Sequence, residues 1–297
     1  MVQLKNKINS ILLRIFNAVQ YPLMEVVFCR NRLNTYCFCN RYFGHTKRNN
    51  LGDDLNIDFL ENLFGKRIIK KEFSLFNKGK TYSFIGSILE YVCNRKESVF
   101  VWGSGFKFAN NNLKDEDIKK NTYLAVRGPL TRNIILKAGG SCPDIYGDPG
   151  ILLSRYIKVD RNIKYKYGLI PHKTEFNSES VTRINQDKDV LLIDIVNYGS
   201  WKEFLEKVNS CEYILSSSLH GIIIADSYLI PNIWVRFTSN IDGGGFKYLD
   251  YFEGVKKNTH CVDLSYVVDF KVVDSELSKW TPPVIDESFI KSCPFKI

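Results

Sequence analysis

A histidine follows three consecutive serines in residues 216–221, which read Ser-Ser-Ser-Leu-His-Gly. An apolar run precedes them and another follows and ends at Pro231, a pattern that predicts a strand, a polar turn and a helix that the proline ends. The free N–H groups and the dipole at a helix start attract anions. His220 at this position is able to exchange a proton with a bound anion. The alternative is structural: the serines cap the helix and His220 is an ordinary buried histidine.

Glycine and polar residues also follow most of the other predicted strands. In an open parallel sheet, ligands bind beyond the carboxyl ends of the strands, so we expect these residues to line one polar cleft. Each has a structural alternative, because an aspartate before a helix caps it and an aspartate before a proline begins a turn. The residues are Asp53, Ser104, Gly105, Arg127, Asp148, His172 and Arg236, with Ser217, Ser218 and Gly221 of the serine turn.

Strands alternate with helices along most of the chain. Apolar strands such as 122–126 and 190–194 are followed by helical patterns such as 130–137 and 200–208. This alternation predicts an α/β fold with doubly wound parallel sheets. A break near residues 155–164 predicts two domains, 1–157 and 158–297, that face each other across the cleft. We expect the tail 285–297 to form a last helix or to return to the first domain.

The composition is that of a globular protein with an excess of positive charge. The chain has 297 residues, of which 44% are hydrophobic and 25% are charged. Its formal net charge of +9 predicts attraction to anions, either phosphorylated substrates or the negative face of a membrane. No run combines dense basic residues with aromatics, so nucleic-acid binding is not predicted. Eight cysteines without a Cys-x-x-Cys pair predict reduced thiols and no metal site.

Residues 1–20 predict an amphipathic helix. We expect it to pack on the body of the protein, and the alternative is a membrane surface. We recognise no signal peptide and no run that is apolar for long enough to span a bilayer. A cytoplasmic location is therefore expected, which includes the cytoplasmic face of the inner membrane. The apolar positions are Leu4, Ile8, Ile11, Leu12, Ile15, Phe16 and Val19.

The order of the strand-end motifs resembles the polysaccharide pyruvyl transferase family over about residues 48–252. No single motif is specific, but the series is. The chain also contains Gly-Ser-Ile-Leu and Phe-Lys-x-x-Asp-Tyr, as in the succinoglycan-type members. The series comprises Asn50-x-Gly52-Asp53, Gly86-Ser87, Gly103-Ser104-Gly105, Arg127-Gly128-Pro129, Gly147-Asp148-Pro149, Ile170-Pro171-His172 and the serine turn, with Pro231 downstream.

The resemblance implies an architecture and a reaction. It implies two Rossmann-like domains arranged as in GT-B glycosyltransferases, with the acceptor on the N-terminal side and the donor on the C-terminal side. It also implies transfer of a pyruvyl group from phosphoenolpyruvate to a sugar of a bacterial exopolysaccharide or capsular polysaccharide, or of its lipid-linked precursor. The product is a pyruvate ketal. Phosphoenolpyruvate is a co-substrate in this reaction, and no cofactor or metal is expected.

Formation of a ketal from an enol ether needs a general acid, a base and cations that hold phosphate and carboxylate. His220 is the predicted general acid, because it would protonate the methylene carbon. Asp53 is the predicted base and is preferred over Asp148. Arg127 and Lys247 are predicted to hold the anionic groups of the donor.

Many members of the family carry an arginine two residues before the histidine, where this chain has Ser218. Arg127, Arg236 and Lys247 are expected to supply the missing positive charge. Two other functions remain open at this point. One is a metal-independent GT-B glycosyltransferase that uses a nucleotide sugar, and the other is a non-catalytic subunit of polysaccharide assembly.

Overall fold

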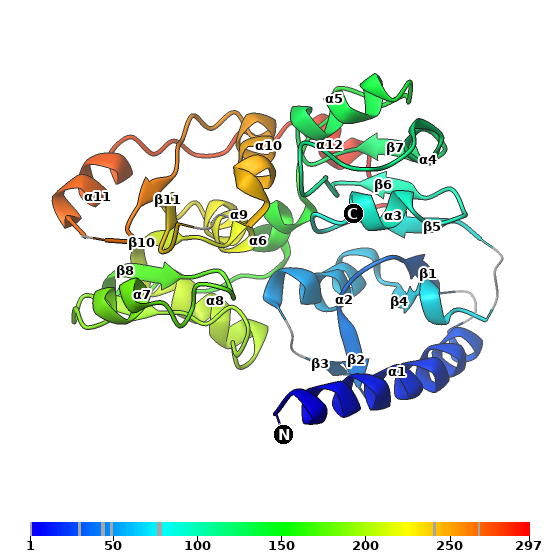
Figure 1. Cartoon of the computed structure of the whole chain (residues 1–297), viewed down its shortest axis with the longest axis horizontal. Helices are drawn as coiled ribbons and strands as arrows, with labels where there is room; N and C mark the ends of the chain where they lie inside the picture. Colours follow the sequence, from blue (N-terminus) through cyan, green and yellow to red (C-terminus); the bar gives the residue numbers. More distant parts are fainter. Residues whose placement is uncertain are drawn as a thin grey trace.

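Two parallel sheets, each with five strands, form the core of the protein in a computed structural model (Figure 1). The structure describes residues 2–28, 31–42, 45–47, 50–75, 79–239, 242–266 and 268–297. Helices connect successive strands, so the α/β class and the Rossmann-like character of both sheets are confirmed. We call the chain up to Tyr156 the N-terminal half and the chain from Tyr165 the C-terminal half. The predicted domain limits themselves stay a prediction.

The first sheet has the strand order β4-β1-β5-β6-β7. Short apolar strands that are buried on both sides are typical of a parallel sheet covered by helices. Its strands are β1 (Arg32–Thr35), β4 (Arg67–Lys70), β5 (Thr81–Ser83), β6 (Phe100–Trp102) and β7 (Thr122–Ala125). Its helices are α2 (Leu51–Phe64), α3 (Leu89–Cys93), α4 (Asp115–Lys119) and α5 (Pro129–Lys137).

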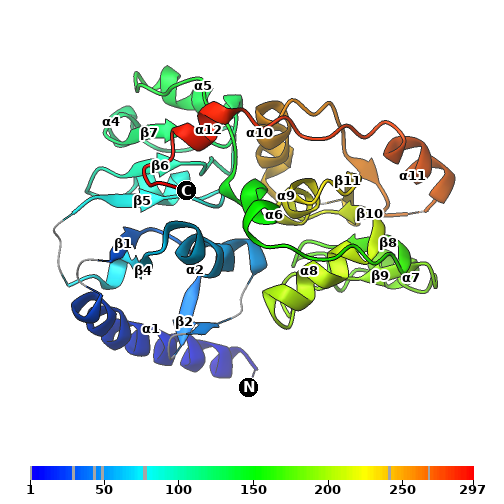
Figure 2. The same ribbon diagram turned by 180° about the vertical axis from the view of Figure 1, so that it is seen from behind.

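The second sheet has the strand order β12-β11-β10-β8-β9, so β10 lies at its centre (Figure 2). Its strands are β8 (Tyr165–Ile170), β9 (Val190–Leu192), β10 (Cys211–Ser216), β11 (Asn232–Arg236) and β12 (Val262–Asp263). Its helices are α7 (Glu179–Ile184), α8 (Trp201–Asn209), α9 (Leu219–Ser227), α10 (Phe246–Gly254) and α11 (Phe270–Leu277).

The remaining elements flank or join the two sheets. The connection between the halves consists of a short 3₁₀ turn, η2 (Pro149–Leu152), and α6 (Leu153–Tyr156), and η2 packs on α9. The other elements are α1 (Val2–Val27), the antiparallel pair β2 (Asn40–Tyr42) and β3 (His45–Lys47), the 3₁₀ turns η1 (Lys71–Phe73) and η3 (Asp242–Gly245), and α12 (Glu287–Lys291).

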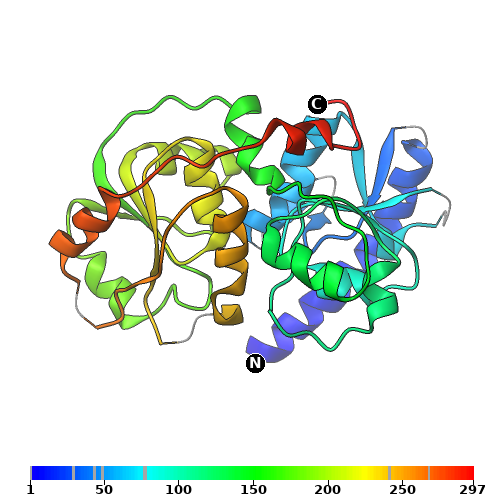
Figure 3. The same cartoon turned by 90° about the horizontal axis from the view of Figure 1, so that it is seen from above.

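The C-terminal segment packs on the first sheet. Figure 3 shows it crossing from the C-terminal half to the N-terminal half. The ring of Phe289 in α12 stacks on Trp102 of β6 at 4.6 Å between centroids, and the Trp102 indole N–H donates to the Phe289 carbonyl at 3.0 Å. Phe295 contacts the rings of Phe64 and Tyr82. These aromatic contacts tie the chain end to a half that lies almost two hundred residues earlier in the sequence.

The predicted amphipathic helix forms as α1 and packs on the body of the protein as expected, but it does so through its more polar face. Of the predicted apolar positions, Phe16 is half-buried, whereas Ile8, Ile11, Leu12, Ile15 and Val19 are exposed, as are Leu23, Val26 and Val27 further along the helix. Tyr21, Asn17 and Glu25, which lie on the opposite face, are buried against the N-terminal half. The spacing of the apolar residues predicted a helix, whereas its orientation depends on polar contacts that the spacing does not reveal.

Candidate functional site

The serine turn joins the central strand β10 to the start of α9, as predicted. The Ser216 hydroxyl lies 2.9 Å from the carbonyl oxygens of both Ile170 and Ser218, and it accepts a hydrogen bond from the Ser218 N–H at 3.0 Å. This hydroxyl therefore fixes the turn against the end of β8. Ser218 is the N-cap residue of α9 and is buried, but its side chain makes no capping hydrogen bond.

Ser217 and Gly221 make close contacts within the C-terminal half. The Ser217 hydroxyl accepts the His172 N–H at 2.8 Å, and its carbonyl accepts the Tyr248 hydroxyl at 2.6 Å. A Cβ on Gly221 would lie 2.4 Å from the Ser216 hydroxyl oxygen, so only glycine lets α9 approach β10 this closely. These contacts give both residues a structural role, and their contact with substrate stays a prediction.

His220 is the second residue of α9 and lies directly against the start of α2 in the other half. A Cβ on Gly52 would lie only 1.9 Å from its Nδ1 atom. Its Nε2 atom is buried and has no hydrogen-bond partner among the described residues. A buried polar atom without a partner costs free energy, and such atoms in folded proteins mark strained sites or sites that bind a missing group.

The His220 imidazole is held neutral in the ligand-free protein. Its pKa is lowered to about 3. Burial is the largest cause, and the positive charges of Lys247, Arg127 and His172 add to it. Strongly shifted pKa values of buried groups with charged neighbours cluster at functional sites, which makes His220 a candidate site residue.

The start of α2 brings two carboxylates, Asp53 and Asp54, to the boundary between the halves, and the two have different neighbours. Asn50 caps the helix through a 3.0 Å hydrogen bond from the Gly52 N–H, and the Leu51 N–H donates to the Ile195 carbonyl of the other half at 3.0 Å. Asp54 is buried and accepts a 2.8 Å hydrogen bond from the Tyr198 hydroxyl. Asp53 is thus the carboxylate of this turn whose main neighbours are cations.

The charges of three lysines act on the carboxyl group of Asp53. Burial raises the pKa of the Asp53 carboxyl, and the positive charges of Lys173, Lys247 and Lys70 oppose this rise, in that order. Lys247 is buried at the start of α10, and Lys70 is buried at the carboxyl end of β4. The predicted Lys247 is therefore brought to Asp53 and His220. We refer to His220, Asp53 and the lysines 70, 173 and 247 as the basic site.

Lys70 and Lys173 are site residues that the sequence reading missed. The signal was available for both, because Lys70 is the last residue of a parallel strand and Lys173 directly follows the predicted site residue His172. His172 itself lies at the end of β8, where its Nδ1 atom is 2.8 Å from the Thr174 hydroxyl oxygen. Its charge contributes to the low pKa of His220, so His172 also belongs to the surroundings of the basic site.

Arg127 follows the end of β7, and its side chain makes contacts within the protein. Its side chain is fully buried, and its Nε and Nη2 atoms lie 3.0 and 2.9 Å from Asp250 Oδ2 of α10. Its other donors reach the Ser87 hydroxyl at 2.5 Å and the Phe106 carbonyl at 2.5 Å. All three guanidinium nitrogens are therefore engaged within the protein. A direct contact with the donor stays a prediction that this geometry does not favour.

Ser104 and Gly105 line the burial site of Arg127 rather than the basic site. The Ser104 hydroxyl pairs with that of Ser83 at 2.7 Å, and its carbonyl accepts the Arg127 N–H at 3.3 Å. A Cβ on Gly105 would lie 2.5 Å from the guanidinium carbon. The glycine thus makes room for the arginine. The predicted contacts of these two residues with substrate remain untested.

Asp148 and Arg236 also have partners of their own. Asp148 is buried at the start of η2, accepts the Gly150 N–H at 2.8 Å, and has a pKa raised to about 7, chiefly by burial. Arg236 pairs with Asp263 of the neighbouring strand at 2.5 Å. Asp148 acts as the cap of η2, and the Arg236 guanidinium is partly neutralised. Neither contact supports the predicted binding of substrate.

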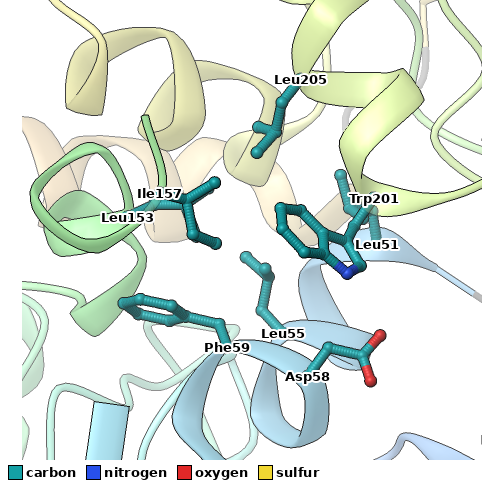
Figure 4. A pocket seen from close by; sticks show the side chains of 8 residues that line it. All are labelled: Leu51, Leu55, Asp58, Phe59, Leu153, Ile157, Trp201 and Leu205. Carbon is teal, nitrogen blue, oxygen red and sulfur yellow. The ribbon is translucent and has the colours of Figure 1, made fainter. Parts of the chain in front are cut away.

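An apolar pocket lies beside the basic site, between α2, α6 and α8 (Figure 4). Asp58 is the only charged residue in its lining, so the pocket is unsuited to an anionic donor. Among the residues that the structure describes, no three His, Cys, Asp or Glu side chains form a group able to hold a metal ion. The lining residues are Leu51, Leu55, Asp58, Phe59, Leu153, Ile157, Trp201 and Leu205.

Two curated proteins share extended similarity with this chain. An uncharacterized protein of Acanthamoeba polyphaga mimivirus is 31% identical over 224 residues, which cover 71% of this chain and 73% of the relative. The succinoglycan biosynthesis protein ExoV of Rhizobium meliloti (strain 1021) is 28% identical over 217 residues, which cover 71% of this chain and 63% of that protein's length. Both matches are long enough to include most of one half and part of the other.

The matched region contains most of the site described above. The model of the polysaccharide pyruvyl transferase family matches residues 44–239, which include Asp53, His172 and His220 but end before Lys247. This range contains the elements from β3 through β11, so it takes part of both sheets. The chain therefore belongs to the polysaccharide pyruvyl transferase family.

Proposed function

We propose that this protein transfers a pyruvyl group from phosphoenolpyruvate to two hydroxyls of a sugar and thereby forms a cyclic pyruvate ketal. The acceptor is a bacterial surface polysaccharide or its lipid-linked precursor. Membership of the polysaccharide pyruvyl transferase family supports the transfer of a pyruvyl group to a polysaccharide. The observation that carries the finer proposal is the buried Nε2 atom of His220, which has no partner among the described residues and lies in a field of positive charge.

The basic site suits a small molecule that carries both a phosphate and a carboxylate. Lys247 and Lys173 lie close enough to Asp53 to influence its ionisation, and Lys247 also acts on His220. The start of α9 adds unpaired N–H groups and the positive end of a helix dipole. In our proposal these groups hold the donor, so that Lys173 and Lys247 together compensate for the serine at position 218.

His220 acts as the general acid in this proposal. The imidazole is neutral in the free protein, because its pKa is about 3. A bound phosphate dianion raises that pKa and thus loads a proton onto the ring. The ring then delivers this proton to the methylene carbon of phosphoenolpyruvate, which becomes the methyl group, and positive charge develops on the adjacent carbon.

Asp53 acts as the base. The first sugar hydroxyl adds to the positively charged carbon and gives its proton to the Asp53 carboxylate. The C–O bond to phosphate then breaks, and the second hydroxyl closes the ring. The two sugar hydroxyls release two protons in total. One replaces the proton that His220 gave to the new methyl group, and the other leaves on the released hydrogen phosphate. The cations near Asp53 oppose the rise that burial gives to its pKa and so favour the ionised carboxylate.

Arg127 is a positioning residue in this account. Its ion pair with Asp250 joins β7 of the N-terminal half to α10 of the C-terminal half. Lys247 lies in the first turn of the same helix α10. The pair therefore fixes the helix that carries one of the proposed donor ligands.

The arrangement of the halves is also part of the proposal. We place the donor on the C-terminal half, around α9 and α10, and the acceptor on the N-terminal half, around the start of α2. This corresponds to two Rossmann-like units that face each other as in GT-B enzymes. Contacts such as Gly52 against His220 support it. The proposed location is the cytoplasm, where phosphoenolpyruvate is made.

The proposal is tested by incubating the purified protein with phosphoenolpyruvate, or in parallel with a panel of nucleotide sugars, and with polymeric and lipid-linked saccharides. Release of phosphate together with an acceptor mass gain of one pyruvyl ketal is expected. Release of a nucleotide would instead identify a glycosyltransferase. Binding of the saccharide without any turnover would identify a non-catalytic assembly subunit.

A further inference from the structure

Helix α1 carries an apolar stripe on the face that points away from the protein. Figures 1 and 2 show α1 along one edge of the N-terminal half. The side chains of the stripe are between 49% and 71% exposed. Large apolar side chains are seldom exposed in a contiguous row on a monomeric protein, and such rows mark interaction surfaces. We define the α1 stripe as Ile8, Ile11, Leu12, Ile15, Val19, Leu23, Val26 and Val27.

The spacing places the α1 stripe on one continuous face. Its residues recur three or four positions apart, as the 3.6-residue period of a helix requires. The opposite face is the one that packs on the protein, through Asn17, Tyr21 and Glu25. The helix is thus attached by its more polar face, and its apolar face is left for another contact.

The charges of this region are almost all positive. The only acidic residue of α1 is Glu25, which is buried, pairs with Arg32 and accepts hydrogen bonds from Ser74 and Leu75. Lys5, Lys7 and Arg14 are the other charged residues of the helix. Residues 1–50 contain eight basic residues and one acidic residue, so they carry +7 of the formal net charge of +9.

We propose that the α1 stripe lies in the surface of an anionic lipid bilayer, with the flanking basic residues on lipid head groups. This combination of an apolar face and basic residues without exposed acids is typical of helices that lie in a membrane interface. No helix of the described chain is long and apolar enough to cross a bilayer. The inference goes beyond the proposed reaction and does not depend on it.

A second copy of the chain fits the α1 stripe less well. Pairing two such helices would bring their basic residues together without an acidic residue to offset them, whereas anionic lipids offset them directly. Pro22 also lies inside the helix between Val19 and Leu23, and a proline within a helix removes a backbone hydrogen bond and disturbs regular packing against a partner helix. Charge and sequence therefore both favour the bilayer.

The proposal is tested by sedimentation of the full-length protein with vesicles of phosphatidylcholine alone or mixed with phosphatidylglycerol. We expect binding to the mixed vesicles that is at least about tenfold tighter than to phosphatidylcholine and that weakens as salt rises. Val19→Asp is expected to weaken the binding about tenfold or more. Val272→Asp is the matched control, because Val272 is a similarly exposed valine on α11, and it should bind like the wild type.

The outcomes distinguish a lipid bilayer from a second copy of the chain as the partner of the α1 stripe, and they do not depend on enzymatic activity. Equal binding by wild type and Val19→Asp would overturn the proposal, as would equal binding to both kinds of vesicle. A dimer in light scattering that Val19→Asp dissociates, without vesicle binding by the wild type, would assign the stripe to a second copy and overturn it too. His220→Ala should bind vesicles normally, so a failure of the proposed reaction does not affect this result.

Discussion

Gly52 of the N-terminal half lies directly against the imidazole of His220 in the C-terminal half. Because a methyl group on residue 52 would overlap the imidazole, we expect Gly52→Ala to displace the ring or to push the halves apart. Overpacking of this kind costs about 1–3 kcal/mol of stability. The cost should largely disappear when the ring is absent.

A double-mutant cycle measures this contact. The free energy of unfolding in urea is compared for wild type, Gly52→Ala, His220→Ala and the double variant. We expect Gly52→Ala to destabilise the wild type but to have little effect in the His220→Ala background. Equal costs in the two backgrounds would mean that residue 52 does not contact the histidine.

The low pKa of His220 predicts how donor binding depends on pH. If the imidazole is neutral in the free protein and protonated with phosphoenolpyruvate bound, binding takes up close to one proton at pH 8. The affinity for phosphoenolpyruvate then falls by up to about tenfold for each unit that the pH rises, in the range between the pKa of His220 in the free protein and its pKa in the complex. Calorimetry in buffers of different ionisation enthalpy measures this uptake, which should vanish in His220→Gln. Unchanged uptake in that variant would exclude His220 as the group that is loaded.

At the scale of elements, α10 of one half caps α5 of the other. Gly128 at the N-cap of α5 has no side chain, and Asp250 replaces the missing cap by accepting hydrogen bonds from the Thr131 N–H at 2.8 Å and hydroxyl at 2.7 Å. A Cβ on Gly128 would lie 1.7 Å from the Asp250 carbonyl, so the glycine permits this approach. The same carboxylate pairs with Arg127.

Removal of one partner of this buried pair should be strongly destabilising. Arg127→Ala leaves the Asp250 carboxylate buried without its cation, and we expect a loss on the order of 3–5 kcal/mol in chemical unfolding. Asp250→Ala in addition should cost less than the sum of the two single changes. Lys291→Ala, in the fully exposed pair with Glu287, is the control and should not change stability measurably. If Arg127→Ala is instead as stable as the wild type and loses only affinity for phosphoenolpyruvate, this account is contradicted and the predicted direct contact of Arg127 with the donor is supported.

Individual strands, turns and helices were predictable because each is specified by a short stretch of sequence. The turn from β10 to α9 follows from an apolar run, three serines and Pro231 within twenty residues. The position of Arg127 was not predictable in this way, since its partner Asp250 lies 123 residues further along the chain. The orientation of α1 could not be predicted for a related reason. Periodicity identifies the apolar face, but the contacts of Glu25 with Arg32 and Leu75 decide which face packs on the protein.

At the scale of the whole molecule, the alternation of strands and helices predicted two parallel sheets, and both are present. It also predicted that residues at the strand ends would meet. The charges of His172 and Lys247 both act on His220, and Lys247, which lies in α10 and not at a strand end, also acts on Asp53. Ser104 and Gly105 instead lie against Arg127, and Arg236 pairs with Asp263. A strand end places a residue at the correct edge of a sheet, but the packing of the two halves decides which of these residues share a site.

The central claim is that His220 protonates phosphoenolpyruvate, and one measurement tests it most directly. Phosphate release and acceptor mass are followed for the wild type and for His220→Ala, with circular dichroism and thermal unfolding as evidence that the variant is folded. We expect the wild type to release phosphate and to form the pyruvyl ketal, and the folded variant to lose at least about a hundredfold in rate. Near-normal turnover by His220→Ala would contradict the account.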